Sequence, residues 1–194
     1  MLDKIAQKIT NQIVLNVEGT TPEKAEQIEY GLYVFISDTL KLFAVLLTAA
    51  ILGQLKYAAV ACAVFAVAKS YWGGVHAKTQ IACIITHFTF VFGTVYLAQA
   101  INLQYLNIVL FAVAGILIFL YVPADLPSKP IISLKRKKEL QIKSAIVWTA
   151  FLVISFLVPG NYSNTISIMA LLSAINTTPV AYKVTGNRRG GVIN

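Results

Sequence analysis

Apolar residues gather along this chain in long blocks that are separated by short polar stretches. A helix needs about 20 mostly apolar residues to cross a bilayer. The pattern predicts six transmembrane helices, over residues 34–52, 57–68, 81–100, 106–122, 145–158 and 165–182. The second and fifth blocks are short, so we expect these helices to be tilted, extended by flanking residues or located where the membrane is thin.

The N-terminal region (1–33) has a different pattern. Between Leu2 and Val17, apolar residues recur at steps of three or four, which predicts an amphipathic helix. A second helix is predicted to start near Pro22 and to run toward Tyr33, because proline is favoured in the first helical turn. Both helices are too polar to cross a membrane, so we expect them at the interface or on the cytoplasmic face.

Composition agrees with a membrane location. Of 194 residues, 57% are hydrophobic and only 12% are charged, whereas soluble domains have about 25% charged residues. The sequence therefore predicts an all-α, polytopic integral membrane protein. A single membrane domain would cover 1–194, with a six-helix bundle over 34–182 and a basic tail over 183–194. We expect no cleavable signal peptide, because the N-terminus lacks a basic tip followed by an apolar core.

Basic residues fall on alternate connections between the predicted spans. The opposite connections hold almost none, with Lys56 as the exception. By the positive-inside rule, this pattern predicts that both termini and the segment around His76 are cytoplasmic. Asp38 and Lys41 are three residues apart on the first span, so we expect them to pair at the headgroup level, with a polar interior as the alternative surrounding. The basic residues of the predicted cytoplasmic side are Lys69, Lys78, Lys129, Lys135, Arg136, Lys137, Lys138, Lys143, Lys183, Arg188 and Arg189.

The basic run Lys135–Lys138 has two interpretations. Such a run could bind nucleic acid, but the pattern of a nucleic-acid-binding module does not surround it. Lysine and arginine next to a membrane helix mostly set topology and contact anionic lipid. We therefore expect membrane lipid, and no nucleic acid, as a partner of this run. The net charge of +8 would also attract an acidic peptide.

The stretch 71–83 carries the candidate chemistry. His76 and Cys83 are seven residues apart, behind Gly73 and Gly74. If the stretch is helical, seven residues bring both side chains to one face, within about 20°. A free thiol has a pKa of about 8.5, so it needs a neighbouring base to become the thiolate that attacks a carbonyl carbon. The two glycines would let the chain turn sharply or approach a substrate closely.

Other interpretations of the same residues remain open. By its spacing alone, Cys83 could pack as a small hydrophobic residue, with His76 marking a turn at the membrane interface. His87 follows Cys83 by four residues and is a rival base, but it would lie deeper, where a neutral, hydrogen-bonded histidine is expected. Cys62 is expected to pack in the second span. The two cysteines suggest neither a disulfide framework nor a metal site.

Three features together resemble the accessory gene regulator B (AgrB) family of bacterial membrane peptidases, over nearly the whole chain. The first is Gly73-Gly74-Val75-His76-Ala77, with Cys83 seven residues after the histidine. The second is Val122-Pro123-Ala124-Asp125, followed by Lys129-Pro130-Ile131 and then the basic run. The third is an amphipathic N-terminus before six apolar segments, with Pro179 near the end of the last.

The resemblance implies a quorum-sensing enzyme of the bacterial cell membrane. It would cleave the acidic C-terminal part from a short precursor peptide of the AgrD type and join the new carboxyl end to an internal cysteine or serine, as a thiolactone or lactone. His76 matches the catalytic histidine of the family, Cys83 its nucleophile, and Gly73 and Gly74 the preceding glycines. Many members have arginine near the place of Lys69, so a bidentate contact to a substrate carboxylate would become a weaker one.

Further candidate residues are less constrained. Asp125 is a possible orienting carboxylate, or it only caps a turn before Pro127. No cofactor is implied, and a homodimer is left open. Alternative functions are a small transporter, although we find no mid-span charge pair or internal repeat, and a non-enzymatic membrane interaction protein. Candidate substrate-binding or supporting residues are Lys69, Gly73, Gly74, Asp125, Lys129, Pro130, Lys135, Arg136, Lys137 and Lys138.

Overall fold

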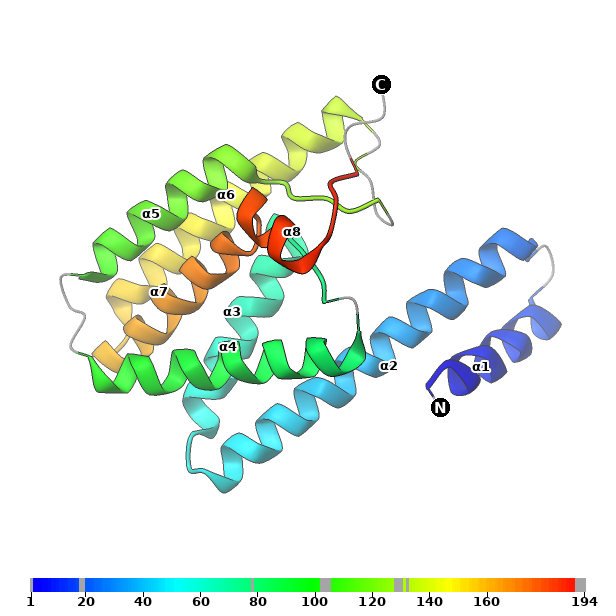
Figure 1. Ribbon diagram of the computed structural model, residues 1–194, viewed down its shortest axis with the longest axis horizontal. Helices are drawn as coiled ribbons and strands as arrows, with labels where there is room; N and C mark the ends of the chain where they lie inside the picture. The colour runs from blue at the N-terminus through cyan, green and yellow to red at the C-terminus, as the bar shows by residue number, and fades with distance from the viewer. Residues whose placement is uncertain are drawn as a thin grey trace. The chain divides into compact units, whose positions relative to one another are not determined.

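The computed structural model describes residues 2–17, 20–77, 79–101, 106–127, 131 and 133–190. Within these residues the chain is helical and forms no β-strand, which confirms the predicted all-α fold of a membrane protein (Figure 1). The chain divides into two compact units, Met1–Thr48 and Ala49–Asn194. The helices are α1 (Leu2–Asn16), α2 (Pro22–Ile51), α3 (Leu55–Trp72), α4 (Gln80–Ala100), α5 (Leu106–Tyr121), α6 (Leu134–Leu157), α7 (Gly160–Ile175) and α8 (Pro179–Thr185).

The first unit contains α1 and most of α2. The predicted amphipathic helix is confirmed as α1, and its residues Ala6 and Thr10 are buried. The predicted helix end near Tyr33 is wrong, because α2 continues without a break to Ile51. The composition changes from polar to apolar near Tyr33, but no proline interrupts the chain there, so the helix continues. Asp38 and Lys41 pair as predicted, with the Lys41 Nζ atom 2.8 Å from the carboxylate.

Three helices of the described residues are long and apolar enough to cross a membrane: α2, α4 and α6. The bent pair α7 and α8 would count as a fourth, and α5 is apolar but shorter. The count of six spans therefore remains a prediction. The helix of the predicted fifth span is extended by flanking residues, one of the outcomes expected for this short block, because it begins at Leu134 rather than at residue 145. The 24 residues of α6 extend about 36 Å, enough to cross the hydrocarbon core.

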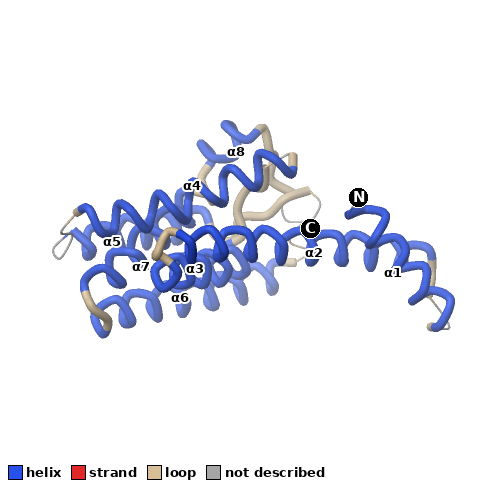
Figure 2. The backbone as a smooth tube through the Cα atoms, turned by 90° about the horizontal axis from the view of Figure 1, so that it is seen from below, coloured by secondary structure: helices blue, strands red, loops and turns tan. Residues whose placement is uncertain are grey.

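Helix α7 is the centre of the second unit and packs against α3, α4, α5 and α6 (Figures 1 and 2). Its buried positions are mostly small or hydroxyl-bearing, which lets neighbouring helices approach closely. Its neighbour α3 also buries alanines along its length. The small buried residues of these two helices are Ala58, Ala61 and Ala68 on α3, and Ser163, Thr165, Ser167, Ala170, Ser173 and Ala174 on α7.

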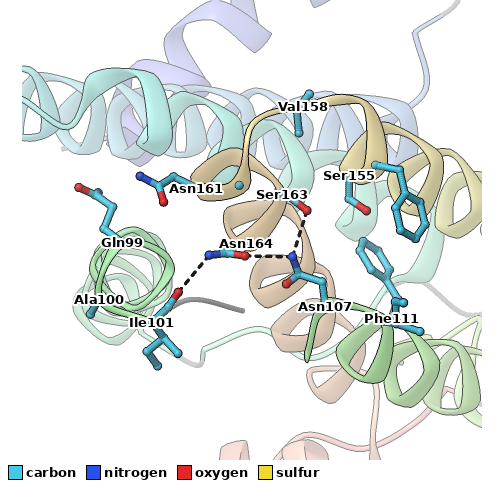
Figure 3. Close-up of a pocket in the computed structure, with 13 residues that line it drawn as sticks. Gln99, Ala100, Ile101, Asn107, Phe111, Ser155, Val158, Asn161, Ser163 and Asn164 are labelled. Atoms are coloured by element: carbon cyan, nitrogen blue, oxygen red, sulfur yellow. Dashed lines mark hydrogen bonds between the residues drawn. The ribbon is translucent and has the colours of Figure 1, made fainter. Parts of the chain in front are cut away.

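A polar network joins α4, α5 and α7 at the end of the bundle where α7 begins (Figure 3). The side-chain amide of Asn107 donates to the Asn164 side chain at 2.9 Å, and Ser167 donates to Asn107 at 2.7 Å. Asn164 in turn donates to the main-chain carbonyls of Ala98 and Ile101. A cavity of about 820 Å³ lies beside this network. Satisfied buried polar networks of this kind fix the relative position of the elements that contribute to them.

The predicted sixth span, 165–182, is broken. Helix α7 ends at Ile175, and α8 begins at Pro179 at an angle of 72° to it. Proline lacks the N–H group that a continuing helix requires, and its ring clashes with the preceding turn. Thr178 adopts an extended conformation before it and caps α8, accepting a hydrogen bond from the Ala181 N–H group. The break brings loop backbone to the residues that follow α3, where the Asn176 carbonyl accepts a hydrogen bond from the Val75 N–H group.

Candidate active site

The segment from Gly73 to Ala77 is not helical. Helix α3 ends at Trp72, and Gly73 and Gly74 have φ angles of +79° and +108°, in a region that L side chains rarely adopt. Because α4 begins only at Gln80, the condition for a shared helix face of His76 and Cys83 is not met. The histidine lies on the connection between two helices, and the cysteine lies in the first turn of the second.

Gly73 and Gly74 lie against Ala124, in the segment that follows α5. The Gly74 N–H group donates to the Ala124 carbonyl at 3.0 Å, and the Ala124 N–H group donates to the Trp72 carbonyl at 2.9 Å. Gly73 and Ala124 form an isolated parallel β-bridge. A Cβ atom on Gly73 would lie 1.9 Å from the Ala124 oxygen, so the close approach of the two backbones requires glycine.

The next peptide groups are held from two other sides. The Val75 N–H group donates to the Asn176 carbonyl, at the break between α7 and α8, at 3.1 Å. The Lys69 Nζ atom donates to the Val75 carbonyl at 2.6 Å. The structure therefore places Lys69 against the main chain of this segment, while its predicted contact with a substrate carboxylate remains a prediction. A Cβ atom on Gly74 would lie 2.8 Å from the Asn176 oxygen, so the second glycine is also required.

His76 is held by the C-terminal part of the chain. The side-chain amide of Asn187 donates to the His76 carbonyl at 2.7 Å. Four stretches of the chain thus bind the main chain of residues 74–76: α3, the segment after α5, the α7–α8 break and the segment after α8. Below them, a small apolar core is formed by Val75, Ala124 and Tyr182, with Leu126 and Ala181 packed against it.

Asp125 is buried beside this core, with 9% of its surface exposed. Its main-chain carbonyl accepts a hydrogen bond from the Tyr182 hydroxyl. Its Oδ2 atom has no hydrogen-bond partner in the described part of the chain. A buried carboxylate oxygen without a partner is costly, so such groups often mark a site that binds a further donor. The orienting role predicted for Asp125 remains a prediction.

Cys83 lies in the first turn of α4 and is half-buried. The Thr79 hydroxyl caps this helix by accepting from the Ala82 N–H group, and the Cys83 N–H group donates to the Thr79 carbonyl at 3.0 Å. One turn further on, the His87 ring packs edge-on against Phe65, with ring centroids 5.4 Å apart. This packing against α3 favours a structural role for the rival histidine.

Cys62 is 94% buried on α3, in agreement with the predicted packing role. The exposed fraction of its surface is 6%. The end of α3 is also fixed to α6, since the Trp72 indole donates to the Ser144 carbonyl at 3.3 Å and the Ser144 hydroxyl donates to the Tyr71 carbonyl at 3.0 Å. These contacts fix the end of α3, from which residues 73–77 (the glycine segment) continue.

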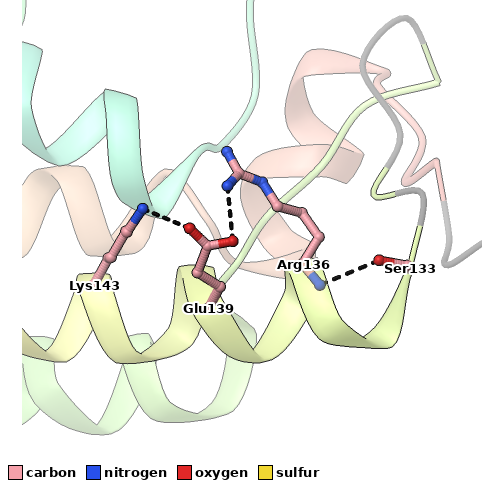
Figure 4. Close-up of polar contacts among 4 residues, drawn as sticks. All are labelled: Ser133, Arg136, Glu139 and Lys143. Carbon is pink, nitrogen blue, oxygen red and sulfur yellow. Dashed lines mark hydrogen bonds and ion pairs between the residues drawn. The ribbon is translucent and has the colours of Figure 1, made fainter.

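The basic run is helical rather than a loop, which corrects the sequence-based boundary. Ser133 caps α6 by accepting from the Arg136 N–H group (Figure 4). Glu139 pairs with Arg136 at 3.0 Å and with Lys143 at 2.6 Å, and all three side chains are about half exposed. Lys135 and Lys138 are exposed and Lys137 is half-buried. The predicted residues Lys129 and Pro130 lie outside the described residues.

Comparison with known proteins decides the family. The sequence profile of Accessory gene regulator B (AgrB) matches residues 3–177 of this chain. The chain belongs to the AgrB family. AgrB membership supports a role in the processing of a quorum-sensing peptide in the accessory gene regulator system.

Individual AgrB relatives are distant in sequence but cover most of the chain. An AgrB-like protein of Clostridium acetobutylicum is 24% identical over 97% of this chain and 90% of its own length. Accessory gene regulator protein B of Staphylococcus intermedius is 27% identical over 79% of this chain and 82% of its own length. A second AgrB-like protein, from Clostridium perfringens strain 13, is 25% identical over 79% of this chain. No solved structure matches.

Several residues that build the site were not predicted from the sequence. Asn176, Tyr182, Asn187 and Arg189 all contact the glycine segment or its supports, yet none stands in a recognisable motif. One local signal was available. Glycine followed by asparagine after an apolar segment is typical of a helix C-terminus, and Gly186 has the left-handed conformation of such a cap.

Proposed function

We propose that this protein is a membrane-embedded cysteine endopeptidase that cleaves the C-terminal part from a quorum-sensing precursor peptide and closes the remainder into a ring. Membership of the AgrB family favours peptide processing over the transporter and the non-enzymatic alternatives. The observation that carries the proposal is the fixed backbone of residues 73–76. The last residue of this backbone is His76. Cys83 follows seven residues later, in the capped first turn of α4.

Cys83 is the nucleophile of the proposed reaction and His76 is its base. His76 accepts the thiol proton, and the Cys83 sulphur attacks the carbonyl carbon of the scissile peptide bond. The carbon–nitrogen bond then breaks, and the leaving amine takes the proton from the His76 imidazolium. The product is a thioester between Cys83 and the N-terminal part of the precursor. Helix N-termini stabilise negative charge, so the position of Cys83 suits a thiolate.

Ring closure follows as a second acyl transfer. A thiol or hydroxyl inside the bound peptide gives its proton to His76, and its sulphur or oxygen attacks the thioester carbon. The bond to Cys83 breaks, and the Cys83 sulphur takes the proton from His76. A thioester retains enough reactivity for this transfer, and exclusion of water from the site favours ring closure over hydrolysis.

The fixed main chain supports this proposal physically. Catalysis by a paired base and nucleophile requires that both be held in place, and errors of about 1 Å can cost 10²-fold in rate. The main chain of the His76 segment is bonded to four other parts of the molecule. A histidine that only marked a membrane-interface turn would not need such support.

The basic residues at the start of α6 are proposed to recruit the acidic part of the precursor. Positive charge in the first turn of a helix opposes the helix dipole, so an anionic partner would relieve this cost. Lys135, Lys137 and Lys138 make no ion pair in the described residues, whereas Arg136 pairs with Glu139. Anionic lipid headgroups would compete for the same side chains.

Trapping the acyl-enzyme tests the proposal. The protein in liposomes is incubated with a precursor whose internal cysteine or serine has been replaced by alanine, so that ring closure is blocked. Intact-mass spectrometry should show the N-terminal product attached to Cys83, and hydroxylamine should release it. Complete cleavage of the normal precursor by the Cys83→Ala variant would overturn the nucleophile assignment.

A further inference from the structure

The family match ends at residue 177, but the chain beyond it folds back onto the candidate active site. We call residues Gly186–Gly190 the C-terminal strap. Its contacts reach the His76 carbonyl, the end of α5 and the α7–α8 break. The basic residues of this region were predicted to set topology and to attract an acidic peptide, and these contacts point to a further, separate role for the strap.

Asn187 is held in place by the end of α8. Gly186 adopts the left-handed conformation, with a φ angle of +63°. Its N–H group donates to the Lys183 carbonyl and the Asn187 N–H group donates to the Tyr182 carbonyl, which together form a Schellman cap. The strap therefore leaves the helix in one defined direction, toward the His76 segment.

Both hydrogen atoms of the Asn187 side-chain amide have an acceptor. One is donated to the His76 carbonyl and the other to the Thr185 hydroxyl, each at 2.7 Å. The Thr185 hydroxyl is itself fixed, since it donates to the Ala181 carbonyl at 2.8 Å. A side chain that is held at both hydrogen atoms has little freedom, so it restrains the position of the His76 peptide group.

Arg189 anchors the strap two residues further on. Its guanidinium donates to the carbonyls of Tyr121 and Thr177, at 3.0 and 3.1 Å. It also lies over the rings of Tyr182 and Tyr121, at 5.3 and 6.0 Å from their centroids. Such cation–π contacts add to the hydrogen bonds and hold the planar group in one orientation.

Gly190 completes the close approach. A Cβ atom at this position would lie 2.8 Å from the Leu126 carbonyl oxygen and 2.9 Å from the Oδ2 atom of Asp125. The strap thus passes directly over the buried carboxylate beside the site.

We propose that Asn187 is a positioning residue for His76 and that Arg189 anchors it. This inference rests on the proposed function, because it assumes that His76 is the base for Cys83. Asn187 bonds to the main chain of the catalytic histidine and not to the reacting atoms. Its loss should therefore slow catalysis without weakening the binding of the precursor.

The reactivity of Cys83 measures this role directly. The Cys62→Ala background leaves Cys83 as the one cysteine of the full chain, because the sequence has two. In this background we would compare Asn187→Leu and Asn187→Asp, which keep the size of the side chain, lack its N–H donors and differ in charge. Arg188→Gln is the matched control, since this neighbouring residue is exposed and makes no hydrogen bond or ring contact in the described part of the chain.

The measurement is the rate of Cys83 alkylation by iodoacetamide between pH 6 and 10 (about the range in which thiols ionise), together with kcat and KM for the precursor. Both Asn187 variants should alkylate more slowly near pH 7 and lose roughly tenfold in kcat, because a displaced base is less effective. KM should stay within about twofold, and Arg188→Gln should behave as the parent.

A His76→Ala variant separates the two proposals. In this variant, Asn187→Leu should have no further effect on Cys83 alkylation, because the group that it positions is gone. If alkylation depends on His76 but not on Asn187, the positioning role is overturned and the proposed function stands. If alkylation is independent of His76, the base assignment fails, and the positioning role fails with it. If Asn187→Leu slows Cys83 alkylation equally in the presence of His76 and in the His76→Ala variant, Asn187 has a general structural role instead.

Discussion

Gly73 and Ala124 lie so close that a Cβ atom on Gly73 would be 1.9 Å from the Ala124 carbonyl oxygen. Their backbones form a parallel bridge between the end of α3 and the segment after α5. The bridge sets the direction in which the chain leaves α3 and therefore the path of the next three residues to His76. Gly74 approaches the Asn176 carbonyl in a similar way, since a Cβ atom on Gly74 would lie 2.8 Å from that oxygen.

Replacement of Gly73 by alanine should therefore destabilise the second unit. The positive φ angle alone costs about 1–3 kcal/mol for a residue with a Cβ atom, and the overlap with Ala124 adds to it. The melting temperature in detergent should fall and precursor processing should be lost. Gly93→Ala is the matched control, because nothing lies within 4 Å of its Cβ position in α4. Normal melting and processing by Gly73→Ala would contradict the structure of this bridge.

The proposed catalytic pair, His76 and Cys83, should fail as a unit. Cys83→Ser should lose most or all turnover, since a serine hydroxyl ionises at far higher pH than a thiol. His76→Ala should be nearly as severe, and the double variant should be hardly worse than either single one. Processing of the precursor is measured by mass spectrometry after equal membrane insertion has been checked.

His87→Ala and Cys62→Ala are the controls for this pair. The His87 ring packs against Phe65 and Cys62 is buried on α3, and neither residue has a role in the proposed reaction. Each variant should keep most of the activity. If His87→Ala loses turnover while His76→Ala retains it, the roles of the two histidines must be exchanged.

The basic residues at the start of α6 should control recruitment of the precursor. Replacement of Lys135, Arg136, Lys137 and Lys138 by glutamine should raise KM and flatten the dependence of processing on salt, because exposed charges act through a screened field. Lys56→Gln is the control, because it removes one positive charge at the N-terminal end of α3, away from the glycine segment. This variant should change neither KM nor the salt dependence of processing. Unchanged rates and salt response in the fourfold variant would leave these residues as topology signals only.

The two ends of α6 give a direct test of topology. Ser133 caps its N-terminus, and Asn161 lies just beyond its C-terminus, in the first turn of α7. Single cysteines at these positions, in a background without Cys62 and Cys83, should react with an impermeant thiol reagent from opposite sides of the membrane. Reaction from the same side would mean that α6 does not cross it.

The apolar helices could be predicted because hydropathy acts over whole segments. The predicted block 81–100 corresponds to α4 (Gln80–Ala100), and 106–122 corresponds to α5 (Leu106–Tyr121). The predicted span 145–158 lies mostly within α6, but the helix begins eleven residues earlier, at Leu134, because helical hydrogen bonds continue through charged residues whereas an apolar block does not. Pro179 gave the local signal for the α7–α8 break. The apolar block 165–182 continues past this proline, so hydropathy alone predicted one unbroken span.

For the candidate site, the sequence indicates residue types but not their geometry. A histidine and a cysteine after two glycines are visible in the sequence, whereas the contacts that hold the main chain of residues 74–76 mostly join distant parts of the chain. Asn187 and His76 are 111 residues apart, and their hydrogen bond depends on how α8 packs. His76 and Cys83 do not share a helical face, because the glycines end the helix rather than extend it.

Most bonds around the glycine segment use main-chain atoms on both sides, as between Gly74 and Ala124 or between Val75 and Asn176. Such bonds depend on the path of the chain and hardly at all on which side chain each partner carries. The bond to Asn176 therefore places no direct demand on the Asn176 side chain, whereas Ala124 must also fit the small apolar core beside Val75 and Tyr182. Proteins that share only a quarter of their residues with this chain could therefore build the same loop, provided that they keep the two glycines.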